Sequence, residues 1–115
     1  MIRGIGIDIV EVDRFRQAMD RWGDRLCKRV FTGSELGYCY AQRYPERHLA
    51  ARFAAKVSLS KALGKRIRFV DVEVTRDAKG PGLMVKGLGE GLNISVTITH
   101  DGNLSMAGTI VERCE

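Results

Sequence analysis

The sequence lacks several features that define whole classes of protein. Its three cysteines are widely spaced and form no CxxC pair, which argues against a disulfide framework or a zinc site and favours a reducing, cytoplasmic location. No apolar run approaches membrane-spanning length, and Asp8, Glu11 and Asp13 interrupt any signal-like N-terminal segment. Aromatic residues make up only 7% of the chain and no nucleic-acid-binding motif appears, so a nucleic-acid partner is not expected.

What is present fits one compact domain. The chain has 115 residues, 44% of them hydrophobic, which predicts a single domain over residues 1–115 with its own core. Nineteen Lys and Arg against fourteen Asp and Glu give a formal charge of +5. This charge favours an anionic partner, which composition alone leaves open among nucleic acid, a phosphate-rich cofactor, an acidic protein and a membrane surface.

Residues 2–10 alternate in a way that predicts a strand. Ile5, Ile7 and Ile9 share one face, and the other face carries Gly4, Gly6 and Asp8. The two glycines are expected to leave space beside the single acid.

Three helices are predicted after this strand. Apolar residues spaced three and four apart indicate a helix over residues 12–22. Thr32-Gly33-Ser34-Glu35 has the form of a capping box, so a second helix is predicted to start at Thr32. A third is predicted after Pro45, running through about Leu63, with Gly64 as its C-terminal glycine.

The C-terminal half predicts strands over residues 68–76, 83–86, 93–100 and 104–112, separated by turns at 78–82 and Asp101-Gly102. The glycines of residues 87–91 are followed by a strand, so they indicate a flexible loop and not a phosphate-binding turn. A strand, then helices, then an antiparallel meander predicts an α+β fold.

Asp8 is the first candidate site residue. A carboxylate within an apolar strand costs free energy unless it is paired or metal-bound. An equally acceptable interpretation is a structural carboxylate that caps the helix beginning near Glu11.

The predicted helix around residues 52–64 carries two cationic rows. Arg52, Lys56 and Ser60 lie four apart on one side, while Lys61 and Gly64 share another. Such rows could bind a diphosphate, although a solvated basic face explains the same pattern. His100 lies on the apolar face of the strand predicted over residues 93–100, so it could equally be a structural histidine at the end of the hairpin.

The order of these blocks resembles one family closely. GIDIVEV at 6–12, VFTGSE at 30–35, RFAAK at 52–56, KALG at 61–64, DVEV at 71–74 and THD at 99–101 follow the order found in holo-[acyl-carrier-protein] synthases. These are the short, single-domain type of 4′-phosphopantetheinyl transferase, and the resemblance covers nearly the whole chain.

The resemblance implies an activity. The family transfers the phosphopantetheine group of coenzyme A to a serine of apo acyl carrier protein, in support of fatty acid biosynthesis, and releases adenosine 3′,5′-bisphosphate. It implies Mg²⁺ as cofactor and a homotrimer with sites between subunits. It implies no nucleic acid or membrane partner.

The resemblance also implies roles for individual residues. Asp8 matches the metal-ligating aspartate and Lys61 the lysine beside the diphosphate, so these two are the implied catalytic pair. The residues that match the coenzyme A site are Arg52, Lys56, Lys61, Gly64 and His100. Arg14 and Arg21 match the basic surface that docks the acidic helix of the carrier protein.

The chain departs from the family at position 57. The family has a second metal-ligating glutamate there, and this chain has Val57. We expect a working transferase with altered metal dependence, because loss of a metal-supporting group usually costs about 10–100-fold in affinity or activity. Another acid, Glu11 or Glu35, could substitute, or the protein could bind coenzyme A or carrier protein with little turnover. Thr99 also replaces the serine common in the family but retains a hydroxyl.

Overall fold

The computed structural model describes residues 1–114, so Glu115, the last residue of the predicted domain, lies outside it. The elements follow in the order β1 (Ile2–Glu11), α1 (Val12–Trp22), α2 (Asp24–Val30), α3 (Gly33–Tyr40), α4 (Pro45–Leu63), a 3₁₀ turn (Phe69–Asp71), β2 (Val72–Asp77), β3 (Gly80–Val85), β4 (Leu92–Asp101) and β5 (Leu104–Arg113). The predicted α+β class is confirmed.

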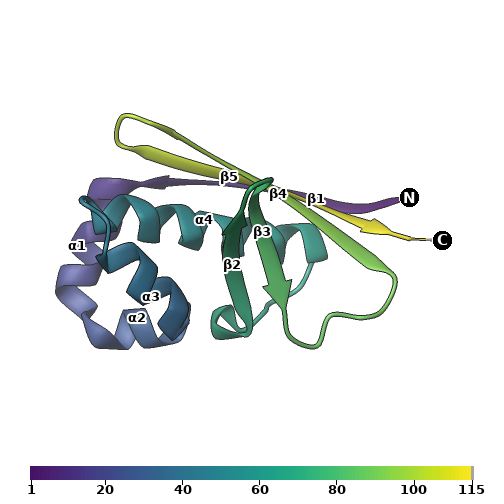
Figure 1. Cartoon of the computed structure of the whole chain (residues 1–115), viewed down its shortest axis with the longest axis horizontal. Helices are drawn as coiled ribbons and strands as arrows, with labels where there is room; N and C mark the ends of the chain where they lie inside the picture. Colours follow the sequence, from purple (N-terminus) through teal and green to yellow (C-terminus); the bar gives the residue numbers. More distant parts are fainter. Residues whose placement is uncertain (115) are drawn as a thin grey trace.

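The strands form two separate antiparallel sheets. β1, β5 and β4 make a long three-stranded sheet in that order, and β2 pairs only with β3. Figure 1 shows α4 running beneath the long sheet, the short helices α1–α3 at one end, and the β2–β3 hairpin beside α4. The predicted meander is confirmed for the antiparallel pairs β2–β3 and β4–β5 but is wrong between β3 and β4, where the chain leaves one sheet for the other. The position of β1 beside β5 was not predicted.

Helix α4 is the centre of the fold, and its ends follow from two residues. Pro45 stands in the first turn, where its missing N–H costs nothing. Gly64 ends the helix with φ 69° in the left-handed region, and its N–H donates to the carbonyl of Ser60 at 3.0 Å. Leu49 and Leu59 are fully buried, because α4 packs against β1 and β5 and against α3.

The two glycines of β1 allow close packing of the strand against α4, which is not the role expected from the sequence. A Cβ built on Gly4 would lie 1.8 Å from the carbonyl oxygen of Ala62, and one on Gly6 would lie 1.9 Å from that of Ser58. Real side chains never approach this closely, so the backbone of α4 fills the space beside β1. The space that these glycines were expected to leave beside Asp8 is therefore occupied by α4, and that prediction is wrong.

The opposite face of the long sheet is uncovered in the isolated chain. Ile5, Ile7 and Ile9 point away from α4 and are 61%, 60% and 52% exposed. Shallow hollows on this face are lined by Ile7 together with Thr97 and Gly108 of the neighbouring strands. Contiguous exposed apolar surface of this kind marks an interaction face.

Candidate functional site

Asp8 and Lys61 meet within one chain. The Nζ of Lys61 lies 3.3 Å from Oδ1 of Asp8 and donates to the carbonyl of Ile7 at 3.0 Å. The Asp8 side chain is 16% exposed and that of Lys61 is 53% exposed, so the ammonium group is accessible to a ligand. The structure favours this pairing over the capping interpretation of Asp8, because α1 has Glu11 at its N-cap.

Position 57 lies one turn before Lys61 on α4, and the half-buried Val57 offers no ligand atom there. Within residues 1–114, no three or more His, Cys, Asp or Glu side chains are placed together as a metal site. The proposed substitute Glu35 is 2% exposed and engaged elsewhere, so it is not available to a metal beside Asp8.

Lys56 requires a correction. Its side chain has no exposed surface, and its Nζ donates to Oε1 of Glu35 at 2.6 Å, to the carbonyl of Val30 at 2.6 Å and to that of Phe69 at 2.9 Å. Burial lowers the pKa of Lys56, and the hydrogen bond that Lys56 donates to Glu35 opposes that shift. With its donors used inside the protein, Lys56 is a structural residue and not a contact for coenzyme A.

Glu35 does more than close a capping box. Its Oε1 accepts from the N–H of Thr32 at 2.8 Å, and the N–H of Glu35 donates to Oγ1 of Thr32, as the sequence predicted. Its Oε2 also accepts from the N–H of Val74 at 2.7 Å. One buried carboxylate therefore joins α3, α4 and β2.

Arg52 forms the buried part of a basic cluster. It is 6% exposed, its Nη1 donates to the carbonyl of His48 at 3.3 Å, and its guanidinium carbon lies 4.7 Å from the centre of the Tyr38 ring. Its Nε is buried without a hydrogen-bond partner among residues 1–114. A buried cation with an unused donor is costly unless an anion completes it.

Two histidines belong to the same cluster. Burial lowers the pKa of His48, the neighbouring Arg52 and Arg76 lower it further, and the carboxylate of Glu46 opposes the shift. Burial likewise lowers the pKa of His100, with Arg47 and Arg76 adding to the effect. Nδ1 of His100 lies 3.0 Å from Oγ of Ser105. The cluster therefore gathers basic side chains of α4 and β2 around the two histidines on α4 and β4.

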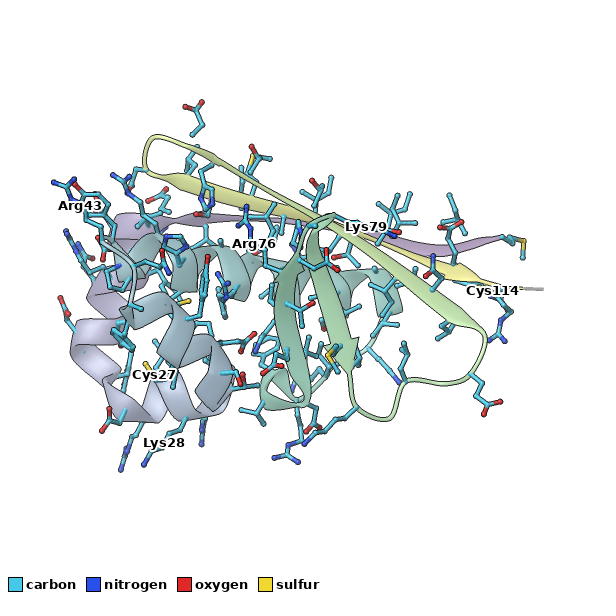
Figure 2. The ribbon with its side chains drawn as sticks, in the orientation of Figure 1. Cys27, Lys28, Arg43, Arg76, Lys79 and Cys114 are labelled. Carbon is cyan, nitrogen blue, oxygen red and sulfur yellow. The ribbon has the colours of Figure 1, made fainter. Side chains whose placement is uncertain are left out.

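Sequence reasoning missed three members of this cluster: Arg47, His48 and Arg76. His48 lies four residues before Arg52 on α4, so helical spacing could have revealed it. Arg76 belongs to β2 and reaches the cluster only through the packing of the hairpin, which no local pattern encodes. Figure 2 labels Arg76 near α4, in the middle of the molecule.

The remaining predicted residues lie at the surface. Arg14 and Arg21 are exposed on α1, and the guanidinium of Arg21 lies 5.1 Å from the ring of Trp22, which is itself 52% exposed. Gly64 contributes backbone only.

A family model described as the 4′-phosphopantetheinyl transferase superfamily matches residues 4–108. The chain belongs to this superfamily. A holo-[acyl-carrier-protein] synthase from Halothermothrix orenii is 42% identical over 97% of this chain and 98% of its own length. Another, from Geobacter metallireducens, is 39% identical over 98% of this chain and 99% of its own. Within the superfamily, the chain is an enzyme of the holo-[acyl-carrier-protein] synthase type.

Solved structures of phosphopantetheinyl transferases share the fold. A holo-(acyl-carrier-protein) synthase from Bacillus anthracis, in complex with CoA (3′,5′-ADP), is 30% identical, with a TM-score of 0.86 and 98% of each chain covered. One from Helicobacter pylori, in complex with coenzyme A, is 27% identical, with a TM-score of 0.81, covering 94% of this chain and 99% of that one. Within the described part of this transferase, no helix has the length and apolarity of a membrane span.

Proposed function

We propose that residues 1–115 form a single cytoplasmic transferase domain that moves 4′-phosphopantetheine from coenzyme A to a serine of apo acyl carrier protein, releases adenosine 3′,5′-bisphosphate and supports fatty acid biosynthesis. The observation that carries this proposal is the contact between Asp8 and Lys61, 3.3 Å apart in a chain that matches holo-[acyl-carrier-protein] synthases along nearly its whole length.

The reaction is a displacement at phosphorus. The serine oxygen attacks the β-phosphorus of coenzyme A and loses its proton, while the bond from that phosphorus to the bridging oxygen breaks and adenosine 3′,5′-bisphosphate leaves. Such a step depends on positioning and on neutralising the phosphate oxygens. Lys61 is placed for this role because its exposed ammonium can turn from Asp8 to the diphosphate.

Asp8 is the residue that would hold Mg²⁺. The donor set is small, because Val57 offers no oxygen, but Mg²⁺ is commonly bound through one or two carboxylates, substrate phosphates and water. Asp8 and the diphosphate together satisfy that minimum. The ion would add positive charge beside the phosphate oxygens when bound.

The basic cluster supports binding of coenzyme A. The unused Nε of Arg52, and the positive charges of Arg47 and Arg76 around His100, support a site for an anion. We assign this anion to the nucleotide part of coenzyme A. With the nucleotide at this cluster and the substrate extending from His100 towards Asp8, Lys61 and the backbone at Gly64 would contact the diphosphate.

The exposed faces support two protein contacts. Arg14 and Arg21 on α1 would dock the acidic helix of the carrier protein, an interaction that should weaken at high salt. The uncovered isoleucines of β1 would be buried between copies of the chain. We propose a homotrimer, as the family resemblance implies, with sites between subunits.

The decisive experiment is a mass measurement. The protein is mixed with apo acyl carrier protein, coenzyme A and Mg²⁺, and the carrier protein is expected to gain the mass of a phosphopantetheine group. Asp8→Asn and Lys61→Met should each lower the rate by about 100-fold or more. Asp71→Asn, which removes one partner of a partly exposed ion pair with Arg68, is the matched control and should leave the transfer rate unchanged.

A second candidate function rests on Val57. The chain could bind coenzyme A or carrier protein with little turnover, since position 57 lacks the family's carboxylate. Absence of transfer at every Mg²⁺ concentration, with transfer restored by Val57→Glu, would establish this function. Absence of transfer in both proteins would reject the transferase proposal.

A further inference from the structure

Helix α1 has no capping side chain of its own. Its N-cap residue, Glu11, makes no capping hydrogen bond. The first N–H groups of a helix lack partners inside the helix, so another part of the molecule must satisfy them. Here Asn103 does so from the β4–β5 turn: its carbonyl accepts from the N–H of Val12 at 2.8 Å, and its Oδ1 accepts from the N–H of Asp13 at 3.0 Å.

Asn103 thereby connects three parts of the proposed site. Its turn is the tip of the hairpin that carries His100 on β4. Glu11, the last residue of β1, pairs with Leu104, so the same turn adjoins the strand that carries Asp8. A hollow of about 320 Å³ beside Asn103 is also lined by Arg47 of the basic cluster. Figure 1 shows the β4–β5 turn at the same end of the molecule as α1.

We propose that Asn103 is a positioning residue for the carrier protein, an inference that rests on the proposed docking of the carrier protein at α1. Arg14 is the third residue of α1, directly after the two N–H groups that Asn103 satisfies. Loss of a capping side chain frays the first turn of a helix. The side chain of Asn103 therefore holds Arg14 in its place relative to Asp8 and His100, while Arg21, in the last turn, depends on it much less.

Asn103→Ala tests this role directly. The bond from the N–H of Val12 goes to the backbone of Asn103 and survives the substitution, so the hairpin stays attached to α1. The KM for carrier protein should rise about fivefold, the size expected from loss of one cap. The kcat at saturating carrier protein and the Kd for coenzyme A should change less than twofold.

Two other variants serve as controls for Asn103→Ala. Asn103→Asp retains an acceptor oxygen and should keep the KM for carrier protein within about twofold of the wild-type value. Gln42→Ala removes a comparable amide hydrogen bond, from Nε2 to the carbonyl of Tyr38 at 3.2 Å, far along the chain from α1, and should leave the KM unchanged.

A double-mutant cycle separates positioning from general destabilisation. In the Arg14→Ala background, Asn103→Ala should raise the KM less than twofold, because the residue that it positions is absent. In the Arg21→Ala background the fivefold rise should persist. The same rise in both backgrounds, or no rise in the wild-type background, would overturn the proposal.

Hydrogen exchange gives a readout that does not depend on activity. Amide exchange in a peptide covering residues 11–19 should be faster in Asn103→Ala than in the wild type and unchanged in Gln42→Ala. Unchanged exchange in Asn103→Ala would overturn the capping role. Failure of the wild-type protein to modify carrier protein would instead reject the proposed function and leave the exchange result standing.

Discussion

The ammonium of Lys56 and the carboxylate of Glu35 lie 2.6 Å apart in the interior of the protein, where neither side chain reaches solvent. The pair connects α3 to α4, and the further bonds of Lys56 reach the end of α2 and the 3₁₀ turn. It is therefore a junction of the helical end with the body of the domain.

Lys56→Met should destabilise the protein by about 3–5 kcal/mol, because it leaves the carboxylate of Glu35 buried and uncompensated. Urea unfolding followed by circular dichroism measures this loss. Asp71→Asn, at the partly exposed pair with Arg68, serves as the control and should cost less than about 1 kcal/mol. A folded Lys56→Met protein of wild-type stability that fails to bind coenzyme A would restore the ligand role that the sequence predicted.

Val57→Glu should increase the affinity for Mg²⁺ and the transfer rate at low Mg²⁺ by about 10–100-fold, because it places a carboxylate one turn before Lys61. Titration of the transfer rate with Mg²⁺ measures the change. Val57→Gln has the same length without the charge and should show little gain. An equal gain in both variants would mean that polarity, and not metal ligation, is what position 57 lacks.

Binding of coenzyme A should strengthen as the pH falls from about 8 to 6. The pKa of His48 and that of His100 are lowered in the free protein, so both rings are largely neutral at pH 7. A bound phosphate would raise these pKa values, so binding takes up protons. Calorimetry in two buffers of different ionisation enthalpy measures that uptake. His100→Gln should reduce the uptake, and uptake unchanged by this substitution would separate His100 from the nucleotide.

Stability of the free protein should follow the opposite trend. A histidine whose pKa is lowered on folding binds protons more readily in the unfolded chain. The contribution of these histidines is therefore present at pH 8 and is lost as the pH falls through about 6.5. Thermal melting of the free protein across this range measures the loss, which should be smaller in His100→Gln.

Ile7→Lys should convert the proposed trimer to monomers and abolish transfer, because it puts a charge into the apolar face of the long sheet. Light scattering after size-exclusion chromatography measures the mass in solution. Met84→Lys is a suitable control, since Met84 on β3 is equally exposed at 63% but lies outside this sheet. A wild-type protein that is monomeric and active would refute the trimer.

The sequence predicted the elements better than their arrangement. Pro45 and Gly64 gave α4 its observed ends, because both act through local backbone geometry. The seven-residue helix α2 was missed, since it follows Gly23 directly and is too short to show a periodic face. The position of β1 beside β5 was also missed, because alternation marks which residues share a face but not which strand lies next to them.

The candidate site was also predicted only in part. Asp8 and Lys61 were paired by resemblance and meet as expected. Lys56 was assigned to the coenzyme A site by the resemblance, and helical spacing put it in one row with Arg52. Its burial depends on the packing of α3 against α4, which brings Glu35 to it and which no local pattern encodes. Arg76 could not be found at all, since only the packing of the hairpin brings it to the histidines.

Gly4 and Gly6 bring β1 against α4 with no side chain between the two backbones. Glycine has the smallest possible side chain, so any other residue at these positions would push the helix outward and carry Lys61 away from Asp8. The two glycines therefore set the distance between Lys61 and Asp8, although neither glycine is expected to contact the substrate. A side chain at position 4 or 6 should therefore disturb the Asp8–Lys61 contact without changing either charged group.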